Sequence, residues 1–316
     1  MIMKITGNKL LLLLVLLLAG KELRAQSNTM YYMRNVPHAY MLNPASQPRS
    51  NVYLGCPLFS SSYFDVHHNS VGLSDIFWND PETGEVLHPF HPDADLTEFL
   101  AKFEDANDIS SNLDFNLISF GFRVKSMYFM VDVTPRFSSG LSFSNELIDF
   151  GVLGNEDYQE FDFSDLGFHM QAHTEVGFGI SRKFGDMITV GIRPKLLFGL
   201  ASLGSRNNQI ELYTSHEIWE LNSHLELNMA TPGILLPVTE GGALDLGGEP
   251  QFDTTINSAG DFINLATGNK GFGMDIGVHV TPVEELTLSA SIIDLGSISW
   301  DNYMYTMEYE GSFEFS

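Results

Sequence analysis

Cysteine and basic residues are both scarce in this sequence. Its one cysteine, Cys56, excludes an internal disulfide and a zinc site built from several cysteines. The 16 Lys and Arg residues are outnumbered by 40 Asp and Glu residues, which gives a formal net charge of −24. Because contacts with phosphate groups need an excess of Lys and Arg, we do not expect nucleic acid as a partner.

Long hydrophobic runs are also lacking. The longest one occupies positions 10–19, after Lys4 and Lys9, and is too short to cross a bilayer as a helix, which takes about 20 residues. A basic start, a short apolar stretch and small residues at a cleavage point are typical of a secretory signal peptide. We therefore predict that residues 1–25 are a signal peptide, cleaved after Ala25, and that the protein is exported.

Apolar and aromatic residues, by contrast, are abundant and regularly spaced. They make up 44% and 12% of the chain, which is too much for a disordered protein. From residue 115 onward apolar side chains occupy every second position, most clearly in 168–181, 188–200, 271–281 and 286–292. A period of two predicts β-strands with one apolar and one polar face. The polar face carries Gly, small residues and charges, as a water-filled interior would.

Strand length and turn spacing favour a membrane barrel. Several predicted strands reach ten residues, whereas a transmembrane strand needs about 9–11 and a globular one usually has about 5–6. Tight turns are predicted at Lys125-Ser126, at Gly185-Asp186 and across 282–285, and the longest connections, 135–160 and 230–270, fall on the opposite side. This alternation is typical of outer-membrane barrels, and a soluble β-sandwich stays as the alternative.

The predicted fold class is therefore all-β, an antiparallel transmembrane β-barrel of the outer-membrane type with short helices in long loops. Residues 26–50 are expected to form an extended, plug-like segment, and residues 51–316 the barrel. Within the long connection 68–114, we predict a helix over 95–107 with Asp95 as its cap. A second helix is predicted near 143–153.

Eleven strands are predicted in all. They are 51–58, 61–67, 115–124, 127–134, 167–183, 187–203, 208–216, 218–229, 271–281, 286–293 and a last strand from 303 onward. Single-chain bacterial barrels have even numbers of strands. Either one strand assignment is wrong or the chain stops before the barrel closes; we favour the second and expect a barrel that is incomplete at its C-terminal end.

Three stretches resemble known sequences. Asn43-Pro44-Ala45 is similar to the Asn-Pro-Ala near the mature start of many Bacteroidota outer-membrane proteins. The run GIRPKLLFG at 191–199 resembles a strand of an uncharacterised Bacteroidota barrel family, and DLGSISW at 294–300 resembles that family's Asp-x-Gly-x-Ile-x-Trp outer loop. The resemblance implies an outer-membrane barrel akin to the long-chain fatty-acid transporter type, related to barrels of type IX secretion. It carries over no substrate-binding residue.

Eight ionisable residues fall mostly on the polar faces of predicted strands and are expected to face the barrel lumen. They are Arg123, Asp132, His173, Glu175, Arg193, Lys195, Asp275 and His279. Two roles are open for them: opposite charges can pair and fill the interior, or they can set the polarity of a passage.

Catalytic and cofactor motifs are missing. The sequence has no Gly-x-Ser-x-Gly elbow, and its Gly-rich stretches lack the Lys-Ser/Thr of a phosphate loop. His67-His68, and His88 with His91, lie in irregular sequence and are interpreted as loop residues rather than metal ligands. We expect no enzymatic activity, no cofactor and no metal.

Three functions compete. The leading hypothesis is a barrel in the outer membrane that binds or passes small molecules, including hydrophobic ones, without covalent chemistry; its partners are outer-membrane lipid and that ligand. The second is a non-transporting barrel that serves as an accessory component of a secretion or surface-assembly machine and contacts its proteins. The third is a soluble secreted β-sandwich that acts as a binding protein.

Overall fold

A computed structural model provides the structure of the chain. It describes Met30, Tyr31, Met33 and residues 36–315, except 57–60, 81–82, 90, 92–93, 95, 156–158, 240–248, 250, 255–257 and 284–285. The predicted signal peptide, the predicted helix cap Asp95 and part of the predicted 282–285 turn lie outside the described residues. No helix in the described part of the chain has the length and apolar character to cross a membrane.

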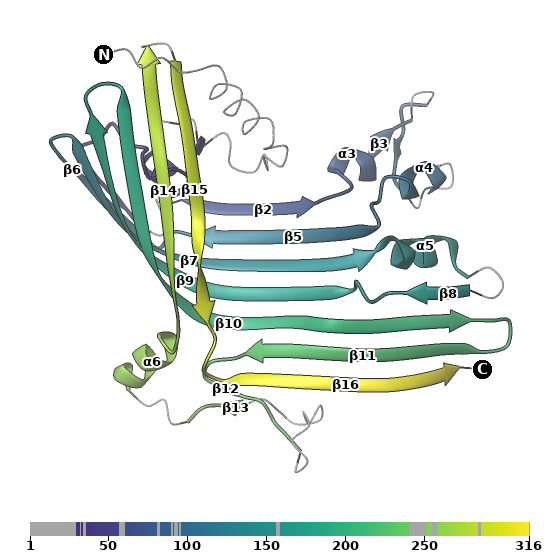
Figure 1. Cartoon of the computed structure of the whole chain (residues 1–316). Helices are drawn as coiled ribbons and strands as arrows, with labels where there is room; N and C mark the ends of the chain where they lie inside the picture. Colours follow the sequence, from purple (N-terminus) through teal and green to yellow (C-terminus); the bar gives the residue numbers. More distant parts are fainter. Residues whose placement is uncertain are drawn as a thin grey trace, which may run out of the picture.

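A twelve-stranded antiparallel sheet dominates the structure (Figure 1), which confirms the all-β class. Its strands are β1 (Val52–Gly55), β2 (Ser62–His68), β5 (Ala106–Phe115), β6 (Ile118–Val124), β7 (Met127–Ser144), β8 (Gln159–Asp162), β9 (Gly167–Phe184), β10 (Ile188–Thr214), β11 (Trp219–Ala230), β14 (Asn269–Val283), β15 (Leu286–Ser299) and β16 (Met304–Phe315).

Smaller elements lie in the connections. Two small two-stranded sheets pair β3 (Trp78–Asn79) with β4 (Val86–Leu87), and β12 (Ile234–Leu235) with β13 (Gln251–Phe252). The helices are η1 (Pro37–Met41), α3 (Leu73–Ile76), α4 (Leu96–Leu100), α5 (Asn145–Leu153) and α6 (Ala259–Ala266).

Of the three long central strands β7, β9 and β10, the outer two, β7 and β10, change partners halfway along their length, whereas β9 pairs with both of them throughout. β7 pairs first with β6 and then with β5, and β10 pairs with β14 over 188–199 and with β11 over 202–214. The sheet therefore has a turn-side half, made of β1, β6, β14, β15 and the adjoining ends of the central strands, and a distal half with β2, β5, β8, β11 and β16. Figure 1 shows the two halves pointing in different directions.

The turn-side half has two chemically different faces, because strand side chains alternate between faces. On one face, a row of paired apolar residues crosses seven strands. The row is Val52, Phe122, Phe129, Ile180, Ile192, Ile276 and Ile292. The other face, which we call the inner face, carries the row Tyr128, Ser181, Gly191, Gly277 and Ser291. A cluster of Tyr40, Tyr53, Tyr128 and Met130 is buried on it.

The tight turns predicted at Lys125-Ser126 and Gly185-Asp186 are confirmed. Lys125, in the two-residue turn between β6 and β7, has φ 56°, and Gly185, in the three-residue turn between β9 and β10, has φ 58°. Both are in the left-handed conformation that tight hairpin turns use and that Gly adopts without strain. The hairpins β6–β7 and β9–β10 and the end of β14 meet at one end of the sheet, since Lys183 N donates to Ser126 O and Thr281 N donates to Met187 O. Figure 1 shows this end at the upper left.

Several predicted boundaries are wrong. The connection predicted over 135–160 begins only after Ser144, because Pro135 pairs with Thr174 inside β7 although proline usually ends a central strand. The helix predicted over 95–107 covers only Leu96–Leu100, and 106–115, assigned mostly to a long connection, is strand β5. Its polar residues give little alternation; pairing with β2 and β7 makes it a strand.

Two further predictions differ from the structure at β-bulges. The strands predicted at 187–203 and 208–216 are one strand, β10, with a register shift beside Asn207 at φ 53°. The motif 294–300, which resembles an outer loop, lies mostly within β15. Asp294 has φ 59° at the register shift between Met274 and Ile276. A bulge re-aims a side chain, and here it is that of Asp294. The helix predicted near 143–153 is confirmed as α5.

The sheet does not close on itself. Among the described strands β15 pairs only with β14, and β16 pairs only with β11. The described residues therefore form an open, strongly curved sheet (Figure 1).

Candidate functional site

A docked segment, residues 36–49, lies against the inner face of the turn-side half. Ser291 Oγ donates to Leu42 O over 2.8 Å, and Ser46 Oγ is 3.0 Å from His279 Nε2. Gln47 Nε2 donates to Ser126 O over 3.2 Å at the β6–β7 turn. These contacts reach β14, β15 and a hairpin turn, so the segment bridges strands far apart in the sheet.

Two glycines make this close approach possible. A Cβ added to Gly191 would lie 2.1 Å from the carbonyl carbon of Pro44, and one added to Gly277 would lie 1.9 Å from Asn43 Oδ1. Asn43 Oδ1 accepts from Ala45 N over 2.9 Å, while its Nδ2 donates to Ala290 O over 3.3 Å. The Asn-Pro-Ala turn therefore packs directly on the backbone of β10 and β14, at two positions that have no side chain.

Next to the docked segment, a buried ion-pair network crosses the inner face. Arg193 is fully buried; its Nε lies 3.0 Å from Asp132 Oδ2 and its Nη1 lies 2.7 Å from Asp275 Oδ2. Lys195 Nζ lies 2.8 Å from Asp275 Oδ1 and 3.5 Å from Glu175 Oε1. Because each buried cation contacts at least two carboxylates, the network compensates much of its own desolvation.

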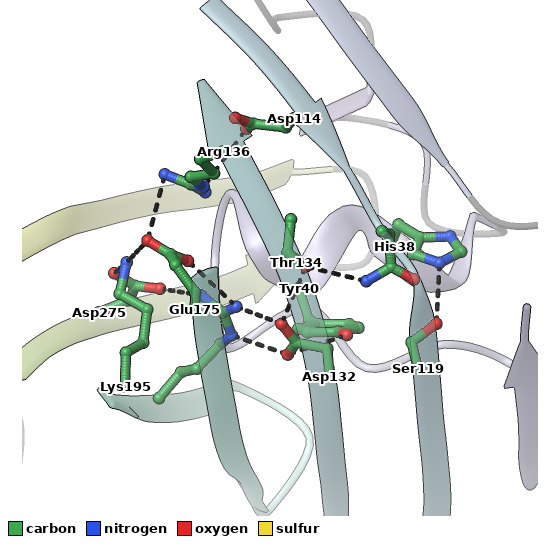
Figure 2. A network of polar contacts seen from close by, with 12 residues as sticks. His38, Tyr40, Asp114, Ser119, Asp132, Thr134, Arg136, Glu175, Lys195 and Asp275 are labelled. Carbon is green, nitrogen blue, oxygen red and sulfur yellow. Dashed lines mark hydrogen bonds and ion pairs between the residues drawn. The ribbon is translucent and has the colours of Figure 1, made fainter. Parts of the chain in front are cut away.

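The network continues toward the distal half through Arg136 and Asp294. Arg136 Nη1 lies 3.0 Å from Asp294 Oδ2 and 3.5 Å from Glu175 Oε1, and its Nε lies 3.5 Å from Asp114 Oδ2. Asp294 also pairs with Lys195, and its backbone N donates to Asp275 Oδ1 over 2.7 Å. The β15 bulge thus joins β14, β10 and β7. Figure 2 shows Asp114, Arg136, Glu175, Lys195 and Asp275 along this line.

The docked segment adds its own polar groups to the network (Figure 2). Tyr40 OH donates to Asp132 Oδ2 over 3.2 Å, and His38 Nε2 lies 3.1 Å from Ser119 Oγ. Burial lowers the pKa of His38, although the Asp132 carboxylate opposes this. Burial together with the same carboxylate raises the pKa of Tyr40 well above its ordinary value. At neutral pH the segment therefore presents an uncharged imidazole and an uncharged phenol.

The segment and the network separate two cavities. The network cavity has a volume of about 650 Å³ and is lined by Asp114, Arg136, Glu175, Lys195 and Asp294, among others. It also has apolar walls, from Met41, Leu42, Leu197, Ile293 and Trp300. The turn-side cavity has a volume of about 780 Å³ and lies between the docked segment and the hairpin ends. Both volumes are in the range of small-molecule sites, about 300–1,000 Å³.

The structure places the eight predicted lumen residues in two groups. Five belong to the network: Asp132, Glu175, Arg193, Lys195 and Asp275. His173 joins them, with its Nε2 3.7 Å from Glu175 Oε1. Arg123 and His279 instead contact the docked segment: Arg123 Nη1 donates to Gln47 Oε1 over 2.6 Å, and Arg123 also binds Pro48 O. His279 contacts Ser46, as described above.

Sequence reasoning missed three members of the network: Asp114, Arg136 and Asp294. Arg136 follows Pro135 in what was predicted to be a connection, and Asp294 reaches the network only because of a bulge. Continued alternation from Asp132 through Thr134 to Arg136 was a signal that could have identified Arg136. The described residues contain no group of three or more His, Cys, Asp or Glu side chains arranged to hold a metal ion.

The three stretches that carry the sequence resemblance meet at this site. Asn43-Pro44-Ala45 rests on Gly191, which begins the 191–199 run, and that run supplies Arg193 and Lys195. Asp294 binds Lys195. Trp300 packs against Gly199, where an added Cβ would lie only 2.6 Å from the Cζ3 atom of Trp300. Chemically, the arrangement can hold the segment in place and offer ligands a charged wall.

Comparisons with known proteins give a family but no named relative. Neither the curated proteins nor the solved structures contain a significant match to the chain. A protein-family model described as a family of unknown function, DUF5723, matches residues 44–316, which include Pro44, the network and all twelve strands of the large sheet. The chain belongs to this family of unknown function, DUF5723.

Proposed function

We propose that the protein is exported to the outer membrane, where its sheet forms part of a lipid-facing β-barrel that binds or passes small molecules through its interior without covalent chemistry. The observation that carries the proposal is the contrast between the two faces of the turn-side half. The proposal places the apolar face in lipid and the inner face, with its docked segment, in the barrel lumen.

The apolar face supports a membrane location. Its residues cross seven strands in register, and large ones stay exposed: Phe178 is 46% exposed, Phe272 56% and Ile292 63%. A contiguous apolar surface of this kind is rare on proteins that face water on that side. The β10–β14 ladder runs from Ile188 to Gly199, enough to cross a bilayer core with tilted strands, which takes about 9–11 residues.

The inner face supports a binding role. The network cavity combines carboxylates and cations on one wall with Leu42, Leu197 and Trp300 on another. Sites of small organic ligands have this mixture of apolar walls and a few fixed polar groups. The proposed ligand is therefore a small molecule with both an apolar and a polar part. The resemblance to barrels of the fatty-acid transporter type agrees with such a ligand.

Membrane placement is tested by charge insertion with a matched control. Ile192, in the apolar row, and Ile218, in the β10–β11 connection, are 39% and 42% exposed. Ile192→Lys should make folding into lipid vesicles less favourable by about 2–4 kcal/mol, while Ile218→Lys should change the folding free energy by less than about 1 kcal/mol. Folding is followed by gel mobility and protease protection. Equal effects, or a wild-type protein that stays in the aqueous fraction, would contradict the proposal.

Binding is tested on the wild-type protein in liposomes. The proposal expects uptake or release of small solutes, with a larger flux when the docked segment is loosened by Asn43→Ala. A barrel that inserts but is inert to solutes, and that co-purifies with secretion proteins, would favour an accessory role in a secretion machine instead.

A further inference from the structure

The turn-side cavity has the opposite charge from the rest of the molecule. Its lining contains three basic side chains, Arg49, Arg123 and Lys183, and one acidic side chain, Asp186. In the whole sequence acidic residues outnumber basic ones, 40 to 16. From these charges we propose that the turn-side cavity is a binding site for a small soluble anion that carries a carboxylate or phosphate group. This site is separate from the one in the network cavity.

One cation of this cavity, Arg123, is already positioned. Arg123 is held by Gln47 Oε1 at 2.6 Å, and its guanidinium carbon lies 5.0 Å from the centre of the Tyr128 ring. A guanidinium has more N–H donors than its two bonds to the docked segment use. Hydroxyl groups of Thr189 and Ser289 line the same cavity. Cations and hydroxyls without a surplus of carboxylates are the groups that recognise carboxylate and phosphate oxygens.

The one acidic side chain of the cavity, Asp186, is weakly bound to Lys183. Lys183 Nζ lies 3.0 Å from Asp186 Oδ1, but the Asp186 side chain is fully exposed and that of Lys183 is 45% exposed. An exposed pair of this kind contributes little, because water and salt screen it. An anion that enters the cavity can therefore take the place of Asp186 beside Lys183 at small cost.

The position of the cavity favours a soluble anion over a lipid headgroup. The cavity is lined by the docked segment and by the side chains that share its face, such as Thr189 and His279. In the proposed placement lipid contacts the opposite face, which carries Phe178, Ile192 and Ile276. On the other side of the network, Asp65, Asp114, Glu175 and Asp294 outnumber Arg136 and Lys195 and disfavour an anion.

A pair of neighbouring residues provides the test. Lys183 lines the cavity, whereas Arg182, next to it on β9, points to the other face and lies 4.9 Å from the centre of the Phe184 ring. Inorganic phosphate and phenyl phosphate are titrated into the full chain in detergent at low ionic strength, followed by calorimetry. We expect saturable binding that Lys183→Gln and Arg123→Gln each weaken about tenfold, that Asp186→Asn strengthens, and that Arg182→Gln changes less than about twofold.

Three outcomes would overturn the inference. They are no saturable binding by the wild type, equal loss in Lys183→Gln and Arg182→Gln, and binding seen only to vesicles of anionic phospholipid, which would assign the cations to lipid headgroups. Arg123 also fastens the docked segment, so Arg123→Gln can fail to fold. In that case the Lys183→Gln result alone decides the test. A protein that inserts into vesicles yet ignores phosphate would refute this site and leave the proposed function intact.

Discussion

Gly177 is the position where one methyl group should do most damage to the ion-pair network. A Cβ on Gly177 would lie 2.5 Å from Arg193 Nε and 2.8 Å from its Cζ, well inside ordinary van der Waals contact. The guanidinium would have to move by roughly 1 Å to restore a normal separation. Its bonds to Asp132 and Asp275 would then lengthen beyond hydrogen-bond range.

The size of the effect follows from burial. Arg193, Asp132 and Asp275 are fully buried, and losing one partner of a buried ion pair costs about 3–5 kcal/mol. Because Gly177→Ala displaces the cation without removing it, we expect a loss of about 2–4 kcal/mol in the free energy of unfolding. Reversible urea unfolding of the vesicle-folded protein, followed by tryptophan fluorescence, measures it.

Gly179→Ala is the matched control. Gly179 lies two residues further along β9 and faces the same side, but its added Cβ would meet the flexible end of Met130 at 3.1 Å. The gain in backbone entropy from Gly to Ala is shared by both variants and cancels in their comparison. In an Arg193→Met background, Gly177→Ala should lose most of its effect. If Gly177→Ala and Gly179→Ala unfold at the same urea concentration, the added methyl group does not displace the Arg193 guanidinium.

Two further predictions concern the docked segment. Asn43→Ala removes hydrogen bonds to Ala290 O and to Ala45 N. We expect it to weaken docking by about 1–3 kcal/mol, measured as faster hydrogen exchange across residues 38–48. Asn222→Ala on β11 is the control and should leave that exchange unchanged. Because burial lowers the pKa of His38 below its ordinary value of 6.5, docking should be fully stable above about pH 6.5 and weaken as the pH falls below it. Hydrogen exchange against pH measures this, and an unchanged pH profile in His38→Gln would refute the role of His38.

The period-two pattern was sufficient to predict the main strands, because alternation reports directly which side chains share a face. Ile188, Val190 and Ile192 alternate with Thr189, Gly191 and Arg193, and these residues take opposite faces in β10. The hairpins at Lys125-Ser126 and Gly185-Asp186 were predictable for the same reason, since a turn interrupts the alternation at a fixed point. The pattern failed for β5 and for the end of β7, where long-range pairing outweighs weak local propensity.

The candidate site could be predicted only in part. Alternation placed Asp132, Glu175, Arg193, Lys195 and Asp275 on one face, but it could not show that their side chains touch. Contact depends on register between strands far apart in the sequence, such as the pairing of Arg193 with Asp275. Asp294 joins them only through a bulge, whose position is set by the pairing of β14 with β15.

By itself, the sequence determined the all-β class, the tight hairpin turns and the separation of apolar from polar side chains, because each depends on neighbours along the chain. Only the tertiary structure decided that residues 36–49 lie on the glycines of β10 and β14, and that basic residues as distant as Arg49, Arg123 and Lys183 line one cavity. The reason is physical: docking and charge clustering depend on which strands become neighbours, and the curvature and register of the whole sheet set that arrangement.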